Sequence, residues 1–192
     1  MKNILIINGH PDKTSFCNEI AKKYLDGAKC VNTNVKLVNL IDLNFKPILE
    51  YGFKQQIELE PDLIKIQQNI NDANHLVFIY PNWWGTYPAL LKGFIDRVFT
   101  PGFAFRYHKK SLFPKKLLSG KTARLIVTMD TPSLFYSLIY KKPGHNSMKK
   151  SILEFCDVKP VKITTFAPIK GSSDKKRIKW LSITKKLGIE SK

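Results

Sequence analysis

The chain has 192 residues, 43% of them hydrophobic, and 32 Lys and Arg residues against 15 Asp and Glu give it a formal net charge of +17 at pH 7. This length suits one domain with a substantial core, and this hydrophobic content excludes a disordered chain. No apolar run approaches the roughly 18–20 residues of a membrane span. We therefore predict a single domain over residues 1–192 that makes no integral membrane contact.

The N-terminus and the cysteines indicate a cytoplasmic protein. The first apolar run, ILII, has only four residues and is followed at once by NGHPD, which is not the pattern of a signal peptide. Cys17, Cys30 and Cys156 are far apart and lack CxxC spacing, which argues against a disulfide framework and against a metal site. Cys17 falls where a first helical turn lowers the pKa of a thiol, and an ordinary packed thiol is the alternative.

The excess positive charge favours anionic partners such as nucleotides, nucleic acids or an acidic membrane surface. The lysines are scattered, however, with only short clusters such as KKSLFPKK (109–116) and SDKKRIK (173–179). No nucleic-acid-binding motif accompanies them. We expect no nucleic-acid partner, and we expect most of the charge to lie on a solvated surface.

Strands and helices are expected to alternate along the whole chain. Aliphatic runs of strand length are typical of parallel strands buried on both faces, and apolar residues at helical spacing predict helices between them. In chain order we expect a strand at 3–9, a helix at 15–29, a strand at 35–40, a helix at 61–73, a strand at 75–81, a helix at 88–99, a strand at 122–130, a helix at 147–157, a strand at 162–169 and a helix at 174–188 with Gly188 as its C-cap. This order predicts an α/β fold with an open, five-stranded, doubly wound parallel sheet.

Two long segments, 42–60 and 100–121, have no clear periodicity. Loops of that length in a compact domain are usually functional or wrap a neighbouring subunit. The second segment holds four aromatic residues for which periodicity gives no place in the core, and aromatic residues at that density usually mark an interface. They are Phe103, Phe105, Tyr107 and Phe113.

Ligands of open α/β sheets bind beyond the carboxyl ends of the strands, where the strand order reverses. The loops after the first, third and fourth strands read GHPDKTSFCN, PNWWGTYP and DTPSLFYSLIYKKPGHN. In the first, Thr14 and Ser15 are N-cap candidates at a helix start that could hold a phosphate group, and His10 could add a donor. The alternative is that Thr14 or Ser15 only caps the helix and that no phosphate group binds there. The dinucleotide fingerprint G-x-G-x-x-G is absent, which disfavours a Rossmann NAD domain.

Two adjacent tryptophans, Trp83 and Trp84, stand in the second loop. An indole ring offers a large stacking area to a flat aromatic ligand, and the turn around Asn82 and Gly85 offers backbone N–H groups to a heterocycle. The alternative is that the tryptophans pack in the core or in a dimer interface. We expect one tryptophan in each role.

The three loops, in this order and spacing, resemble those of the flavodoxin-like NAD(P)H:quinone oxidoreductases, most closely the short bacterial members. The resemblance covers most of the chain. It implies a flavodoxin-like fold with strand order 2-1-3-4-5, a homodimer, and a tightly held flavin, FMN or FAD. FMN is favoured because the chain is short. It implies a ping-pong reaction in which NADH or NADPH reduces the flavin and a quinone-like acceptor then takes two electrons.

The resemblance also assigns site residues. It implies a phosphate-side loop with His10, Thr14, Ser15, Phe16 and Asn18, a loop beside the flavin ring with Pro81, Asn82, Trp83 and Trp84, and a third flavin loop with Thr128, Met129, Asp130 and Thr131. The family's catalytic tyrosine matches Tyr136. His145 lies close to, but not at, the spacing of the family's histidine, which falls near Lys142.

Three departures from the family pattern concern the chemistry. Cys17 stands in SFCN where the family has asparagine, and Asp130 and Pro132 replace glycines of the third loop. Because the histidine spacing differs, Lys142, Tyr140 or water are alternatives to His145 in a proton relay. Two other functions stay open: an electron-carrier flavodoxin, and a flavin-free binding or regulatory protein on the same fold.

Overall fold

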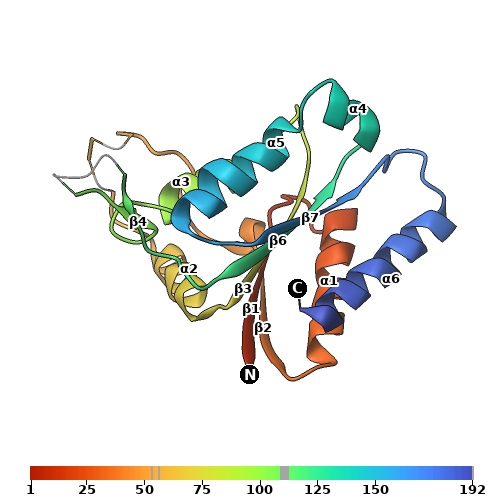
Figure 1. The fold of residues 1–192 in the computed structure, drawn as a ribbon, viewed down its shortest axis with the longest axis horizontal. Coiled ribbons are helices and arrows are strands. Elements are labelled where there is room, and N and C mark those ends of the chain that lie inside the picture. The colour runs from red at the N-terminus through yellow and green to blue at the C-terminus, as the bar shows by residue number, and fades with distance from the viewer. Residues whose placement is uncertain (53, 56, 109–112, 192) are drawn as a thin grey trace.

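A computed structural model describes residues 1–52, 54, 55, 57–108 and 113–191 (Figure 1). Its centre is a five-stranded sheet in which every neighbouring pair is parallel. The strands are β1 (Lys2–Asn8), β2 (Thr33–Asn39), β3 (His75–Pro81), β6 (Thr122–Thr128) and β7 (Val161–Phe166). Their order in the sheet is β2-β1-β3-β6-β7, which is 2-1-3-4-5 when only these five are counted. The predicted fold class and strand order are confirmed.

Helices cover both faces of the sheet (Figure 1). On one face lie α1 (Phe16–Lys29) and α6 (Asp174–Glu190), and on the other lie α2 (Pro61–Asp72), α3 (Ala89–Val98) and the helical run of α5 (Pro143–Asn146), η2 (Ser147–Leu153) and η3 (Glu154–Cys156). Successive side chains of a strand point to opposite faces. Thus Ile4 and Ile6 pack in the core under α1, and Leu5 and Ile7 pack in the other core.

The crossing of α1 and α6 depends on two glycines. A Cβ atom on Gly27 would lie 2.1 Å from the carbonyl oxygen of Lys185, and one on Gly188 would lie 2.3 Å from that of Tyr24. The backbones therefore touch at this point. The prediction that Gly188 ends the last helix is wrong, because α6 continues to Glu190 and Ser191 is its left-handed cap.

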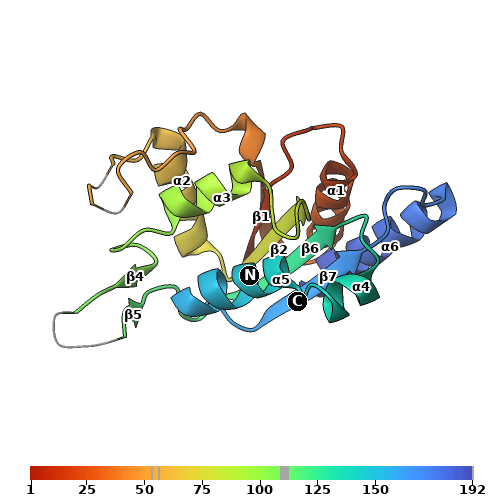
Figure 2. The ribbon, with the colours of Figure 1, turned by 90° about the horizontal axis from the view of Figure 1, so that it is seen from above.

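Some short elements were not expected from periodicity. They are η1 (Leu40–Asp42), α4 (Ser133–Leu138), and the strands β4 (Phe105–Arg106) and β5 (Lys115–Lys116), which pair as an antiparallel hairpin. Residues 109–112 of the predicted lysine cluster lie outside the described residues. Figure 2 shows the hairpin extending from one end of the molecule, away from α4 and α6.

The aromatic residues of this hairpin region divide into two groups. Phe103 and Phe105 are partly buried against the core, and the ring of Phe105 lies 5.1 Å from that of Phe155. The prediction that they have no place in the core is wrong for these two. Tyr107 and Phe113 are exposed, so only they remain candidates for an interface.

The long segment before α2 is held onto α3 by Arg97, which is 2% exposed. Its guanidinium group donates to the carbonyl oxygens of Lys46 and Glu58 and to both carboxylate oxygens of Glu60, at 2.7–3.2 Å.

Among the described residues, no helix is long and apolar enough to cross a membrane.

Candidate functional site

The strand order reverses between β1 and β3, and a cavity of about 180 Å³ lies beyond the carboxyl ends of the central strands. The three loops identified from sequence line it together. The lining residues are His10, Ser15, Phe16, Cys17, Pro81, Asn82, Trp83, Thr128, Met129, Asp130 and Ile169. The expected meeting of the three loops at one edge of the sheet is therefore found in the structure.

The first loop closes through its own side chains. Ser15 is the N-cap of α1, and its hydroxyl oxygen accepts from the backbone N–H of Asn18 at 3.4 Å. Thr14 is not the cap, because its N–H and hydroxyl both donate to Asp12 Oδ1, at 2.7 and 2.8 Å. The Asn18 amide donates to the carbonyl oxygen of Lys13 at 2.5 Å. Thr14 and Asn18 thus shape the loop and do not line the cavity.

The second loop is a tight turn between Trp83 and Thr86. The N–H of each donates to the carbonyl oxygen of the other, at 3.1 and 2.9 Å, and the two central residues both have positive φ, 50° for Trp84 and 78° for Gly85. This is a type I′ geometry, in which the N–H groups of the two central residues are not used by the turn itself.

The two tryptophans lie in different surroundings, but neither is in the core. Trp83 is 44% exposed, lines the cavity, and forms a T-shaped contact with the His10 ring, with centroids 5.4 Å apart. Trp84 is fully exposed. The alternative that one tryptophan packs in the core is therefore wrong.

The third loop is bonded to its neighbours on both sides. Thr128 Oγ1 lies 3.2 Å from the Cys17 thiol, and a carboxylate oxygen of Asp130 accepts from the N–H of Lys170 at 2.6 Å. Burial raises the pKa of Cys17 to about 12. The Cys17 side chain is 1% exposed, which confirms the packed-thiol interpretation, and the raised pKa disfavours an activated thiolate at the helix start.

Tyr136 joins the second and third loops. Its ring is buried in α4, its hydroxyl donates to the carbonyl oxygen of Gly85 at 2.8 Å, and the N–H of Gly144 donates to it at 3.0 Å. Burial raises the pKa of this hydroxyl. The phenol is therefore neutral at pH 7, and its proton is engaged by the turn that carries Trp84.

His145 lies beside Tyr136 despite the altered spacing. The two rings meet edge to face with centroids 5.1 Å apart, and the imidazole is 5% exposed. Burial, and then the charge of Lys142, lower the pKa of His145 to about 4. It is a neutral imidazole at pH 7, and its Nε2 atom has no hydrogen-bond partner among the described residues.

Sequence reasoning missed two residues that line the cavity. Ile169 follows β7, a strand end outside the three loop motifs, and Cys17 occupies a position where the family pattern has asparagine. Conversely, Trp84 and Thr131 do not line the cavity. Tyr136 and His145 are also absent from the cavity lining. Their rings contact each other, and Tyr136 is hydrogen-bonded to Gly85 in the turn that bears Trp84.

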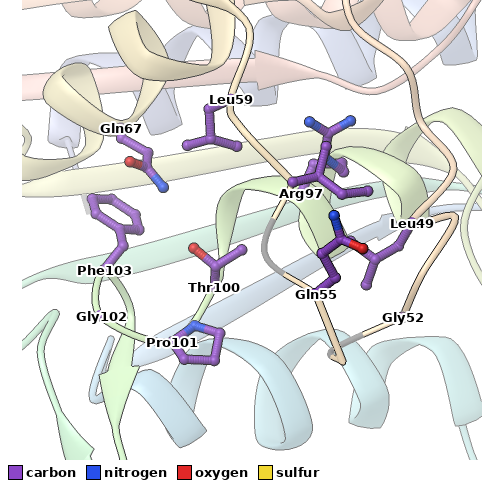
Figure 3. Close-up of a pocket in the computed structure, with 11 residues that line it drawn as sticks. Leu49, Gly52, Gln55, Leu59, Gln67, Arg97, Thr100, Pro101, Gly102 and Phe103 are labelled. Atoms are coloured by element: carbon purple, nitrogen blue, oxygen red, sulfur yellow. The ribbon is translucent and has the colours of Figure 1, made fainter.

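A larger cavity, of about 470 Å³, lies elsewhere, under the segment that Arg97 holds (Figure 3). Leu49, Leu59 and Phe103 give it apolar walls. The guanidinium of Arg97 is already bonded to Glu60 and to backbone carbonyl groups. Among the described residues that line this cavity, none ends a strand of the central sheet, and the one charged group, Arg97, is paired internally, so we place the chemistry at the smaller cavity.

A family profile described as flavodoxin-like fold matches residues 2–181. The chain belongs to this family. Among curated proteins, one named uncharacterised NAD(P)H oxidoreductase, from Haemophilus influenzae, is 28% identical over 180 residues, which cover 91% of this chain and 88% of the relative. A ribosyldihydronicotinamide dehydrogenase [quinone] of Homo sapiens is 26% identical and covers 92% of this chain and 86% of its own length.

Solved structures agree with the fold. The protein Smu.1420 from Streptococcus mutans UA159 superposes with a TM-score of 0.84 at 34% identity, over 98% of this chain and 99% of that one. An FMN-dependent NADH-azoreductase from Bacillus anthracis, solved with FMN, superposes with a TM-score of 0.75 at 21% identity, over 100% of this chain and 97% of that one.

Proposed function

We propose that this chain is a flavin-dependent NAD(P)H:acceptor oxidoreductase that reduces quinones or related acceptors by two electrons in a ping-pong cycle. The observation that carries the proposal is the convergence of the three loops on one cavity at the switch point of the sheet. The relatives named as an NAD(P)H oxidoreductase and as a ribosyldihydronicotinamide dehydrogenase [quinone] support it.

The residues of the site suit a flavin mononucleotide. The start of α1, capped by Ser15, presents the free N–H groups and positive dipole end that bind phosphate. Trp83 lines the cavity with a partly exposed indole ring, and the Trp84–Gly85 turn offers N–H donors to a heterocycle. At about 180 Å³ the cavity is below the roughly 300–1,000 Å³ of complete ligand pockets. We therefore assign the remainder of the flavin site to the open surface around the Trp84 turn.

The bound flavin supplies the hydride chemistry, and the protein supplies position and electrostatics. We propose that Tyr136 is the proton donor to the acceptor, as the resemblance implies. Donation requires that its hydroxyl give up the bond to the Gly85 carbonyl oxygen. We propose that His145, which is neutral above about pH 4, supports the Tyr136 ring and does not act as a cationic acid.

Two further properties belong to this proposal. We propose a homodimer whose interface includes the exposed aromatic residues Tyr107 and Phe113 beside the β4–β5 hairpin. We also propose a cytoplasmic location, because Cys17, Cys30 and Cys156 are all free thiols.

The test is to purify the full chain, extract any flavin and identify it beside FMN and FAD standards. Loaded protein is then mixed anaerobically with NADH or NADPH, and a quinone is added after the flavin absorbance is lost. Loss of absorbance followed by its recovery supports the proposal. Reduction by dithionite but not by either nicotinamide would indicate an electron carrier, and failure to bind either flavin would indicate a flavin-free protein.

A further inference from the structure

Helix α6 turns a strip of lysine and isoleucine side chains toward solvent. Its buried residues, Trp180, Thr184 and Gly188, form one narrow stripe against α1. Residues of an α-helix are spaced by roughly 100°, so six large exposed side chains fall within an arc of about 120° on the side opposite this stripe. These six, here called the α6 face, are Lys175, Ile178, Lys179, Lys185, Lys186 and Ile189.

The α6 face lies apart from both the candidate site and the proposed dimer interface. Helix α6 covers the same face of the sheet as α1, whereas α2 and α3 cover the other (Figure 1). None of the described residues that line the cavity at the strand ends belongs to α6. Figure 2 shows α6 at the end of the molecule opposite to the β4–β5 hairpin. A role for the α6 face is therefore separate from flavin binding.

The positive charges of the α6 face are not balanced within the helix. Asp174 and Glu190, at its two ends, are the only acidic residues of α6. Lys175 and Lys179 are four residues apart, a spacing at which like charges destabilise a helix. Lys175 also lies in the first turn, where the helix dipole disfavours a cation. Among the described residues, no salt bridge involves any of the four lysines of the face. This pattern indicates an external anionic partner.

The two isoleucines distinguish between kinds of anionic partner. Ile178 is 66% exposed and Ile189 is 41% exposed, and the two lie on the same side of the helix because they are eleven residues apart. The phosphates of nucleic acid are contacted by cations, polar side chains and backbone N–H groups, and aliphatic side chains add nothing to such contacts. At a membrane surface, lysines stay at the headgroups while aliphatic side chains enter the acyl boundary. The composition therefore favours lipid.

We propose that the α6 face docks on an anionic phospholipid bilayer, with α6 lying along the membrane surface. A convex helix at the end of the molecule suits a flat, fluid surface (Figures 1 and 2). The net charge of +17 adds attraction to anionic lipid and opposes the approach of a second copy. This proposal does not depend on the proposed oxidoreductase activity.

The test is co-sedimentation of the full chain with vesicles of equimolar phosphatidylcholine and phosphatidylglycerol, compared with vesicles of phosphatidylcholine alone. We expect partitioning to the anionic vesicles at least about tenfold stronger than to the neutral ones. Binding should weaken as salt is raised, because salt screens the attraction between lysines and headgroups.

A first pair of variants tests the charges. Lys179→Gln combined with Lys186→Gln should weaken partitioning to the anionic vesicles by about tenfold or more. The same change at Lys65 and Lys150, which are exposed on α2 and η2, has an equal effect on net charge. It should weaken partitioning far less, because these lysines lie on the other face of the sheet.

A second pair tests the isoleucines. Ile178→Gln should weaken partitioning by about fivefold or more, because an aliphatic side chain no longer leaves water. Ile48→Gln is the control, since Ile48 is equally exposed, at 68%, but lies outside α6. It should leave partitioning unchanged.

The proposal is overturned if the wild type does not bind anionic vesicles, or if the losses within either pair are equal. It is also overturned if Ile178→Gln leaves vesicle binding unchanged while the lysine pair weakens binding to an oligonucleotide in fluorescence anisotropy, which would indicate a nucleic-acid surface. A lower mass for Ile178→Gln than for wild type, in light scattering without lipid, would show an interface between two copies instead. Unfolding in urea checks that each variant is folded.

Discussion

The hydroxyl of Tyr136 and the carbonyl oxygen of Gly85 lie 2.8 Å apart, and this hydrogen bond fixes the Trp84 turn against α4. The same hydroxyl accepts from Gly144, at 3.0 Å, so one side chain connects three segments beside the candidate site. The bond gives Tyr136 a structural role in addition to the catalytic role that we propose for it.

Tyr136→Phe should therefore lower stability as well as activity. The change removes the hydroxyl's bonds to the Gly85 carbonyl oxygen and the Gly144 N–H, but these two groups stay bonded to each other at 2.9 Å, so the free energy of unfolding in urea should fall by about 0.5–1.5 kcal/mol. Tyr87→Phe is the control, since its hydroxyl contacts only the adaptable hydroxyl of Ser147, at 3.1 Å, and it should cost less. Equal stability of wild type and Tyr136→Phe would show that the hydroxyl does not hold the turn.

Tyr136→Phe should also slow acceptor reduction by roughly 10- to 100-fold, the usual effect of losing one positioned proton donor. Flavin reduction by NAD(P)H should change little. Stopped-flow measurement of the two half-reactions separates these effects. If acceptor reduction is unchanged, Tyr136 is a structural residue only.

Two buried histidines should make the fold sensitive to mild acid. Burial lowers the pKa of His75 to about 3 and that of His145 to about 4, whereas both titrate near 6.5 in the unfolded chain. Their pKa values are depressed, so the stability they contribute is complete above pH 6.5 and is lost as the pH falls toward 4. The free energy of unfolding should fall by up to about 1.4 kcal/mol per pH unit for each histidine between pH 6.5 and 5.

Urea unfolding at pH 7, 6 and 5 covers this window, which lies above most of the titration of unfolded carboxyl groups. The partly buried His10, whose pKa burial also lowers, adds to the slope of the two buried histidines. His145→Gln and His75→Gln should each remove part of the slope, up to about half of it. A wild-type stability that is constant over this range would contradict the burial of both imidazoles.

Helix propensity alone predicts that replacing a helical glycine with alanine stabilises the protein, but at the crossing of α1 and α6 we predict destabilisation. Gly27→Ala and Gly188→Ala would each gain about 1 kcal/mol as isolated helical substitutions. A Cβ atom within 2.1–2.3 Å of a backbone oxygen cannot be accommodated without moving a helix. The net effect should be a loss of about 1–3 kcal/mol in urea unfolding. Exposed Ser182→Ala on α6 is the control, and a stabilising Gly27→Ala would show that the helices do not touch there.

The sequence predicts the sheet well because its strands are nearly continuous aliphatic runs, as in β1 and β3. The strand order followed from the family resemblance and not from periodicity. Helix α4 could not be found by periodicity, since it has six residues and only Tyr136 is buried. Gly188 was misread because a glycine at a helix crossing and a glycine at a helix end look alike in sequence.

For the candidate site, the sequence indicated which loops meet but not where each side chain lies. The side chains of Thr14 and Asn18 form hydrogen bonds within the first loop. Ser15 and Trp83 line the cavity, whereas Trp84 is exposed to solvent. These outcomes depend on hydrogen bonds between near neighbours and on left-handed turn residues, which a spacing pattern does not encode.

The most direct test of the account is an equilibrium titration of FMN, followed by flavin fluorescence, against wild type and two alanine variants. Trp83→Ala changes the cavity at the strand ends, and Leu49→Ala changes the larger cavity under the Arg97 segment. We predict one FMN per wild-type chain, binding at least about tenfold weaker in Trp83→Ala, consistent with the loss of roughly 1–3 kcal/mol of aromatic stacking, and unchanged binding in Leu49→Ala. Weakening by Leu49→Ala alone, or no flavin binding by the wild type, would contradict the placement of the active site.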